Sequence, residues 1–216
     1  MPSRLSRLPP GRHGLPREFV DRNQRDRISA GIIAAVADLG YHEATITAIT
    51  DRAGVSRRTF YHYFSSKQEC FLATFDLIAS YLQEAMAEAA ADAPDWPAAV
   101  RAKLATLLAT FAANPDLARF VLIAPSRAGE EIAARYRLAI DRGLEIFSEG
   151  LDSAATRTVT LAAREATMGG VAALIVSQVE AGNGEHLPEL MPDLLELMLA
   201  PYLGRAKAAS IARSIF

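Results

Sequence analysis

Two short helical segments joined by one tight turn constrain the fold of this chain more than any other feature of its sequence. Apolar residues are spaced to face inward in residues 45–53, and Gly54 ends this segment. Ser56 follows at once and can cap a second segment, residues 57–63, by accepting an N–H of its first turn. Because residues 53–55 leave room only for a tight turn, the two helices must cross steeply, as in a helix-turn-helix.

The rest of the sequence is also typical of helices. From residue 23 onward apolar residues recur at steps of three and four, and no run alternates with a period of two. Ser66 and Glu69 have the spacing of a capping box. The longer helices are expected at residues 67–91, 128–150 and 154–181, with a last one from about 187–189 past Pro201. The sequence therefore predicts an all-α fold, with a three-helix N-terminal domain followed by a larger helical domain.

Charge is distributed unevenly along the chain. Residues 1–67 carry 11 Lys and Arg against 6 Asp and Glu, whereas residues 68–216 carry 12 against 19. A basic segment on an acidic body indicates that one end meets a polyanion. A basic tail explains the charge equally well, because four of the arginines lie among the prolines and glycines of residues 1–20. We expect a flexible basic arm at residues 1–22, a helix-turn-helix domain at 23–67 and a helical body at 68–216.

Composition excludes several classes of protein. The single cysteine, Cys70, rules out a disulfide framework and a multi-cysteine metal site, and it fits a reducing compartment. The longest apolar-rich stretch, residues 166–179, is shorter than the roughly 18 residues of a membrane span. The four histidines are dispersed, and no catalytic, phosphate-binding or dinucleotide motif occurs. We therefore expect a cytoplasmic chain that is not an enzyme, has no catalytic or metal site, binds no cofactor and contacts no membrane.

The segment of sequence RRTFYHYF at residues 57–64 carries the functional signal. Phe60 and Phe64 share one helix face and can anchor it in a core. The side chains expected to point outward are Arg57, Arg58, Tyr61 and His62. Arginines can bind guanine O6 and N7 in the major groove, and the aromatic rings can contact thymine methyls or phosphates. A solvated face of a small bundle is the alternative, but such faces favour Lys and Glu.

Residues 26–70, which include LGYHEATITAITDRAGVSRRTFYHYFSSKQEC, resemble the DNA-binding domain of TetR-family transcriptional regulators. The shared features are the glycine that closes the first helix, the AGVS turn at residues 53–56 and the TFYHYF run at 59–64. The resemblance implies that the recognition helix starts with Ser56, Arg57, Arg58 and Thr59, and that Tyr61, His62 and Tyr63 contact bases and phosphates. It also implies that Thr45, Thr47 and Lys67 contact the phosphate backbone of the DNA. Lys67 would do so at the N-terminus of a helix.

The resemblance further implies a homodimer on a palindromic operator, because two recognition helices must lie about 34–36 Å apart. A stripe of small residues in the 154–181 stretch allows close approach of another backbone, and larger apolar groups follow in the last helix. The expected interface residues are Ala162, Ala166, Gly169, Ala173, Val176, Leu194, Leu197 and Met198. Packing of the same stripe against residues 128–150 of its own chain is the alternative.

A small-molecule effector is expected in the first part of the helical body, where ligand sites of helix bundles lie. The candidate lining residues are Phe75, Tyr81, Leu104, Leu108, Phe111, Phe120, Tyr136, Ile140, Phe147 and Met168. Any one of them could equally belong to a solid core. An effector weakens DNA binding only if it favours a conformation with a different spacing of the recognition helices, and the rigid helix 67–91 is the natural lever.

Two functional hypotheses follow from the sequence. The first is a dimeric regulator, most simply a repressor, that binds double-stranded operator DNA and is released by a small, largely apolar effector of unknown identity. The second is a helical enzyme or small-molecule-binding protein whose helix-turn-helix no longer binds DNA. The basic and aromatic segment at residues 57–64 favours the first hypothesis. Steeply salt-dependent binding to a palindrome would discriminate between them.

Overall fold

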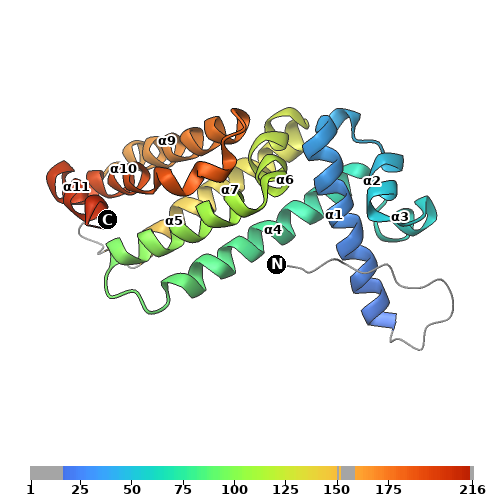
Figure 1. Ribbon diagram of the computed structural model, residues 1–216, viewed down its shortest axis with the longest axis horizontal. Helices are drawn as coiled ribbons and strands as arrows, with labels where there is room; N and C mark the ends of the chain where they lie inside the picture. The colour runs from blue at the N-terminus through green and yellow to red at the C-terminus, as the bar shows by residue number, and fades with distance from the viewer. Residues whose placement is uncertain (1–16, 150, 152–158, 215–216) are drawn as a thin grey trace.

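The computed structural model describes residues 17–149, 151 and 159–214, and within these residues every regular element is a helix. Three helices, α1 (Arg17–Glu43), α2 (Ile46–Ala53) and α3 (Arg57–Tyr63), form a cluster at one end of the molecule (Figure 1). Helix α4 (Lys67–Ala90) leads from this cluster along the helical body. The expected all-α fold, with a helix-turn-helix domain before a larger helical domain, is confirmed.

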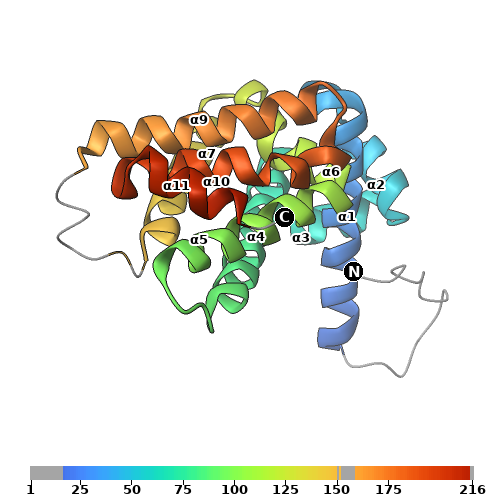
Figure 2. The ribbon, with the colours of Figure 1, turned by 60° about the vertical axis from the view of Figure 1, so that its left-hand side comes forward.

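The body follows α4. Its elements are α5 (Trp96–Ala113), α6 (Pro115–Ala118), a π-helical turn η1 (Arg119–Ile123), a 3₁₀ helix η2 (Ala124–Arg127), α7 (Glu130–Ser148), α9 (Leu161–Glu180), a 3₁₀ helix η3 (Gly184–Leu190), α10 (Met191–Leu203) and α11 (Arg205–Arg213). Helices α9 and α10 run side by side along one edge of the body (Figure 2). Among the described residues no single helix meets the length and hydropathy of a membrane span; α5 and the segment Pro115–Arg127 do so only as a pair bent by 112°.

Local capping interactions produce the short helices that the sequence predicts. Thr45 Oγ1 accepts a hydrogen bond from the Ala48 N–H and caps α2, and Ser56 Oγ accepts one from the Thr59 N–H and caps α3. Between them Gly54 has a φ of 63°, in the left-handed region that a glycine adopts without strain. The chain can therefore end α2 and begin α3 within three residues.

Three boundaries differ from the expectation. The helix expected from residue 154 begins at Leu161, after the extended Thr160, and residues 152–158 lie outside the described residues. Helix α1 begins at Arg17, so the predicted flexible arm of residues 1–22 is wrong for residues 17–22, and residues 1–16 lie outside the described residues. A contact with α3, through Asp21, holds this first part of α1 where the sequence shows no apolar period. The last predicted helix is in fact divided, because Gly204, with a φ of 78°, separates α10 from α11.

A continuous apolar core connects the cluster to the body. In the cluster, Ile28, Ile49 and Phe60 are fully buried. Phe71, near the start of α4, packs on Phe120 of η1 with ring centroids 4.3 Å apart. Cys70 beside it is also buried, and burial raises the pKa of its thiol to about 12, as expected for a core residue rather than a reactive one. Helix α4 therefore packs in both regions.

Helices α1 and α2 approach each other closely at Gly31. A Cβ atom at this position would lie 2.6 Å from the Ile49 carbonyl oxygen and 2.8 Å from the Ala53 Cβ. Both atoms belong to α2, on backbone or directly attached to it, so neither can move without moving the helix. Gly31 therefore sets how deeply α2, and with it the following turn, sits against α1.

We expect Gly31→Ala to lower the free energy of unfolding by about 1–3 kcal/mol, because the added methyl group overpacks the contact between α1 and α2. Gly143→Ala in α7 is the matched control: among the described residues no neighbouring atom lies within 4 Å of the place its methyl group would take, so the change should be neutral or stabilise by up to about 1 kcal/mol. Chemical denaturation at one protein concentration measures both. A Gly31→Ala protein as stable as the natural one would contradict this view of the contact.

Candidate functional site

The outward face of α3 carries the basic and aromatic side chains that the sequence singles out. Phe60 and Phe64 are buried and hold the helix in the cluster. Arg57, Arg58, Tyr61 and His62 are all exposed, and half of the Tyr61 surface is open to solvent. A helix that turns two arginines and two aromatic rings toward water presents hydrogen-bond donors and apolar edges to an incoming duplex.

The hydroxyl groups around α2 and α3 lie beside this face. Thr45 and Thr47, at the start of α2, are exposed. Ser56 is exposed and Thr59 is half-buried, and their side-chain oxygens are 2.9 Å apart. The Ser56 hydroxyl also caps α3, so it stabilises the helix whatever else it contacts.

Tyr63 lies at the edge of the exposed face and is tied to α1. Its hydroxyl donates a hydrogen bond of 2.7 Å to Asp21 Oδ1, and the Arg25 guanidinium lies 5.5 Å from the ring centroid. Burial, reinforced by this hydrogen bond, raises the pKa of Tyr63 to about 12. The phenol therefore stays protonated and fastens the end of α3 to α1.

Lys67 begins α4 and is half-buried against the end of α1. Its Nζ donates to the backbone carbonyls of Tyr41, at 2.6 Å, and His42, at 3.2 Å, and lies 4.4 Å from the Tyr41 ring centroid. Burial lowers the pKa of this ammonium group. An ammonium has three N–H donors, so two are engaged here and a third is available to a phosphate. Lys67 therefore has a structural role that the sequence did not indicate.

Arg27 is the residue in this region that sequence reasoning missed. It is only 7% exposed, and its guanidinium donates to the Gly54 carbonyl oxygen at 2.5 Å. The bond runs from α1 to the residue that forms the turn between α2 and α3. The sequence indicates this role only through the position of Arg27. Residue 27 lies one helical turn before Gly31, on the helix face that meets α2. Because arginine is rarely buried, its residue type alone predicts an exposed side chain.

A cavity of about 390 Å³ lies in the body among α4, α5, η1, α7 and α9. This volume is within the usual range for small-molecule sites. Most of the apolar residues expected around an effector line it: Phe75, Leu104, Phe111, Tyr136, Ile140, Phe147 and Met168. Burial raises the pKa of the Tyr136 phenol, which remains protonated at neutral pH.

Three residues expected at this cavity lie elsewhere. Tyr81 is 57% exposed on α4, because it is one position away from the buried Leu82 and so turns about 100° off the inner face. Leu108 and Phe120 are buried but absent from the cavity wall. Phe120 packs instead on Phe71, in the contact that joins the body to the cluster.

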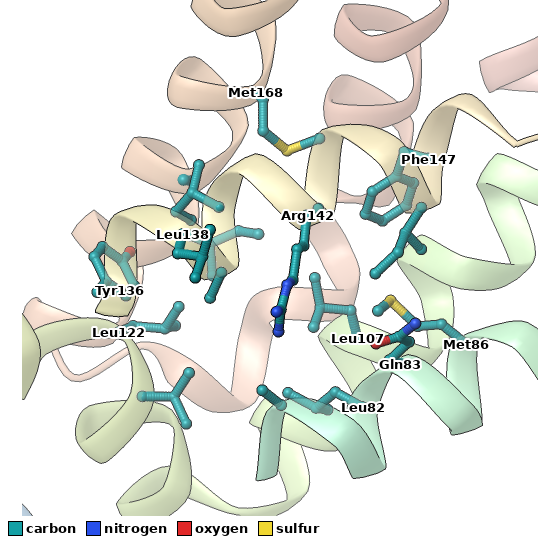
Figure 3. Close-up of a pocket in the computed structure, with 18 of the residues that line it drawn as sticks. Leu82, Gln83, Met86, Leu107, Leu122, Tyr136, Leu138, Arg142, Phe147 and Met168 are labelled. Carbon is teal, nitrogen blue, oxygen red and sulfur yellow. The ribbon is translucent and has the colours of Figure 1, made fainter. Parts of the chain in front are cut away.

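The sequence did not reveal the polar part of the cavity wall. This part consists of Asp76, Ser80, Gln83, Arg135 and Arg142. Arg135 and Arg142 are seven residues apart in α7, so they share a helix face with each other, and that spacing could have identified them. Figure 3 shows Arg142 extending from α7 into the space between the apolar side chains of the facing helices.

The residues expected at a dimer interface divide into two groups. Ala162, Ala166, Gly169 and Ala173 are exposed along α9, and Val176 and Leu197 are half-buried. Leu194 and Met198 are buried in the core of their own chain, so the expectation that they meet a partner is wrong. Helix α10 turns these two positions inward. Two exposed leucines on α9, Leu161 and Leu174, were not anticipated.

The fold and this face together define a class of protein: a helix-turn-helix domain mounted on a helical body with a partly open cavity. Comparison with known proteins supports a helix-turn-helix domain at this end of the chain. Residues 30–74 match the sequence model of the family described as "Bacterial regulatory proteins, tetR family". Residues 30–74 thus form a domain of the type found at the N-terminus of these regulators, and the resemblance drawn from residues 26–70 is confirmed.

Curated regulators match part of the chain. The HTH-type transcriptional regulator BetI of Serratia proteamaculans (strain 568) is 36% identical over 72 residues, which are 33% of this chain and 36% of that regulator. BetI of Yersinia pestis is 35% identical over 72 residues, with the same coverage. The match thus spans about a third of the length of these regulators.

Solved structures resemble the chain over most of its length. The fatty acid degradation regulator FadR from Bacillus halodurans has a TM-score of 0.72 at 18% identity and covers 84% of this chain and 95% of its own. FadR from Bacillus subtilis, solved in complex with stearoyl-CoA, has a TM-score of 0.67 at 19% identity and covers 83% and 98%. At these identities the likeness concerns the fold.

We expect Arg27→Met to lower the free energy of unfolding by about 1–3 kcal/mol, because it leaves the Gly54 carbonyl without its charged donor. Arg22→Met is the matched control: Arg22 is exposed on the same helix, and its replacement should change stability by less than about 0.5 kcal/mol. Thermal or chemical unfolding distinguishes the two variants. Equal stability of both would mean that Arg27 does not hold the turn.

Proposed function

We propose that this chain is a ligand-responsive, DNA-binding transcriptional regulator that acts as a homodimer, with the recognition helix α3 in the major groove. The observation that carries the proposal is the exposed face of α3, whose arginines and aromatic rings are held outward by the buried Phe60 and Phe64. We assign this protein to the cytoplasm, where its DNA would be. In its specific form, the proposal is that the chain is a repressor. It would leave a palindromic operator when a small, largely apolar effector binds.

The proposed contacts follow from the positions of the side chains. Arg57 and Arg58 are exposed at the N-terminal end of α3, where recognition helices meet base edges. Tyr61 and His62 follow on the same open face. The groups proposed to contact the phosphate backbone are Thr45, Thr47, Ser56, Thr59, Tyr63 and Lys67, of which Tyr63 and Lys67 also brace α3 and α4 against α1. Base contacts specify the sequence, and phosphate contacts set orientation and affinity.

We expect Arg58→Ala, and likewise Arg57→Ala, to relax sequence preference by about 1–3 kcal/mol, because each removes donors to a base edge. Lys67→Ala should weaken binding to all DNA similarly and lower the salt slope by about 1, because it removes a phosphate contact. Selection of preferred duplexes from a random pool, followed by salt titrations on specific and random DNA, measures both effects. Equal losses on specific and random DNA for Arg58→Ala would contradict its assignment.

If the natural chain binds no duplex at low salt, the alternative of an enzyme or small-molecule-binding protein with an inactive helix-turn-helix replaces this proposal. A palindrome bound with steep salt dependence supports the regulator.

The proposed dimer interface is the small-residue surface of α9, formed by Ala162, Ala166, Gly169 and Ala173, together with Val176 and the neighbouring Leu197 of α10. Small side chains let two helix backbones approach closely, and the flanking Leu161 and Leu174 add apolar area that is open to solvent in the single chain. Two chains paired through α9 and α10 would form a four-helix contact. Dimerisation through this surface presents two copies of α3 to one duplex.

We expect Ala173→Glu to raise the dimer dissociation constant at least tenfold and to weaken operator binding, because it places a charge in the proposed interface. Ala89→Glu is the matched control, since Ala89 is an exposed alanine on α4, outside this surface. Analytical ultracentrifugation and a DNA-binding titration provide the two readouts. If Ala173→Glu stays dimeric with full operator affinity, the interface lies elsewhere.

The proposed effector site is the cavity in the body. Two polar contacts join its α7 wall to α4: Gln68 Nε2 donates to Glu131 Oε2 at 2.6 Å, and Arg135 lies 3.6 Å from Asp76. Because Gln68 is adjacent to Lys67, which holds the end of α1, a shift of α7 can reach the helix-turn-helix through the first turn of α4. The Bacillus subtilis FadR structure contains stearoyl-CoA, which supports a ligand site in a fold of this kind.

A further inference from the structure

The walls of the cavity suit a ligand with an extended apolar portion. Leu82 and Met86 of α4, Leu107 of α5, Leu122 of η1 and Phe147 of α7 face one another across it (Figure 3). A volume of about 390 Å³ accommodates a small organic molecule. Burial of such a molecule against these side chains would contribute the greater part of the binding free energy, by the hydrophobic effect.

One charged group in this wall has no counter-charge. Arg135 is paired with Asp76 at 3.6 Å, so those two charges balance. Arg142 also lines the cavity, and no carboxylate pairs with it in the part of the chain that the structure describes. Its side chain extends from α7 toward α4 across the space between the apolar side chains (Figure 3), and it is also exposed to solvent. The described wall therefore carries one net positive charge, and this charge is directed at the space a ligand would fill.

Helix α5 fixes the part of α7 that bears Arg142. The Lys103 ammonium, which is buried, donates to the Ile146 carbonyl at 2.5 Å and pairs with Glu149 at 2.8 Å. The Trp96 indole N–H donates to the Phe147 carbonyl at 2.9 Å. These bonds satisfy carbonyls in the last turn of α7, four and five residues after Arg142. The backbone that carries the guanidinium is thus held in place before any ligand binds, which limits the cost of binding.

We infer that the effector is an amphiphilic monoanion: an apolar body lies between α4, α5 and α7, and a single carboxylate-type oxyanion pairs with Arg142. This inference rests on the proposed function, since it names the chemistry of the ligand of that site. A guanidinium binds a carboxylate through two parallel N–H···O bonds, whereas a neutral head group forms weaker bonds and a cation is repelled. A single negative charge neutralises the single unpaired positive charge of the described wall.

The test uses three probes with the same ten-carbon chain: decanoate, decanol and decylammonium. Isothermal titration of the full-length natural protein at neutral pH, below the aggregation concentration of each probe, gives three dissociation constants. We expect decanoate to bind about tenfold more tightly than decanol, and decylammonium to bind more weakly than both. Arg142→Gln should abolish the preference for decanoate and leave the affinity for decanol unchanged.

Arg137→Gln is the matched control, because Arg137 is an exposed arginine of α7 that pairs with Glu130 and does not line the cavity. It should keep the full preference for decanoate. Equal affinities for decanoate and decanol in the natural protein, or a preference that survives Arg142→Gln, would overturn the inference while leaving an apolar effector site in place. If none of the probes binds, the inference is also overturned, and DNA binding measured separately decides whether the regulator stands.

Discussion

The contact between α1 and α2 is the constraint on which the rest of the structure depends. Because Gly31 has no side chain, the backbones of α1 and α2 lie too close together to leave room for a Cβ atom there. From the same face of α1, the Arg27 guanidinium donates a hydrogen bond to the carbonyl oxygen of Gly54. These interactions fix the turn, and the turn fixes the direction of α3. With Phe60 anchored below, α3 can only present its basic and aromatic face to solvent. The proposed reading of DNA is thus a consequence of how tightly two neighbouring helices pack.

Helix α4 links that arrangement to the body. At its first turn, Lys67 holds the end of α1 and Gln68 contacts α7. One turn further, Phe71 packs on Phe120. The C-terminal half of the same helix lines the cavity with Leu82 and Met86. A ligand that alters the spacing of α4 and α7 therefore acts on a helix that also supports the helix-turn-helix, which is what coupling between two sites requires.

The sequence was sufficient to predict the elements that depend on local chemistry. The caps at Ser56 and Ser66, and the buried Phe60 and Phe64, all lie where spacing and side-chain type placed them. The sequence could not predict the contacts between residues that lie far apart in the chain. Periodicity assigns a face to Leu194 or Tyr81 but does not say whether another helix covers that face. Arg27 and Lys103 are buried although charged side chains are usually exposed. Their contacts become evident only when the positions of both partners are known.

The same distinction applies to the candidate sites. The exposed face of α3 was predictable because its signal lies within eight residues. The cavity needed five elements to be brought together, so the apolar wall was predicted only in part and Arg142 was missed. The α9 surface shows both cases: its small residues are exposed as the pattern indicated, while the two positions on α10 that lie in the core required the tertiary structure.

Hydroxyl-radical footprinting tests the central claim most directly, with the full-length protein bound to the duplex that it selects from a random pool. Two copies of α3, related by a two-fold axis, should protect two patches on one face of the duplex, with centres about 34–36 Å apart, one helical turn. A single protected patch, or uniform protection of any duplex, would contradict the account.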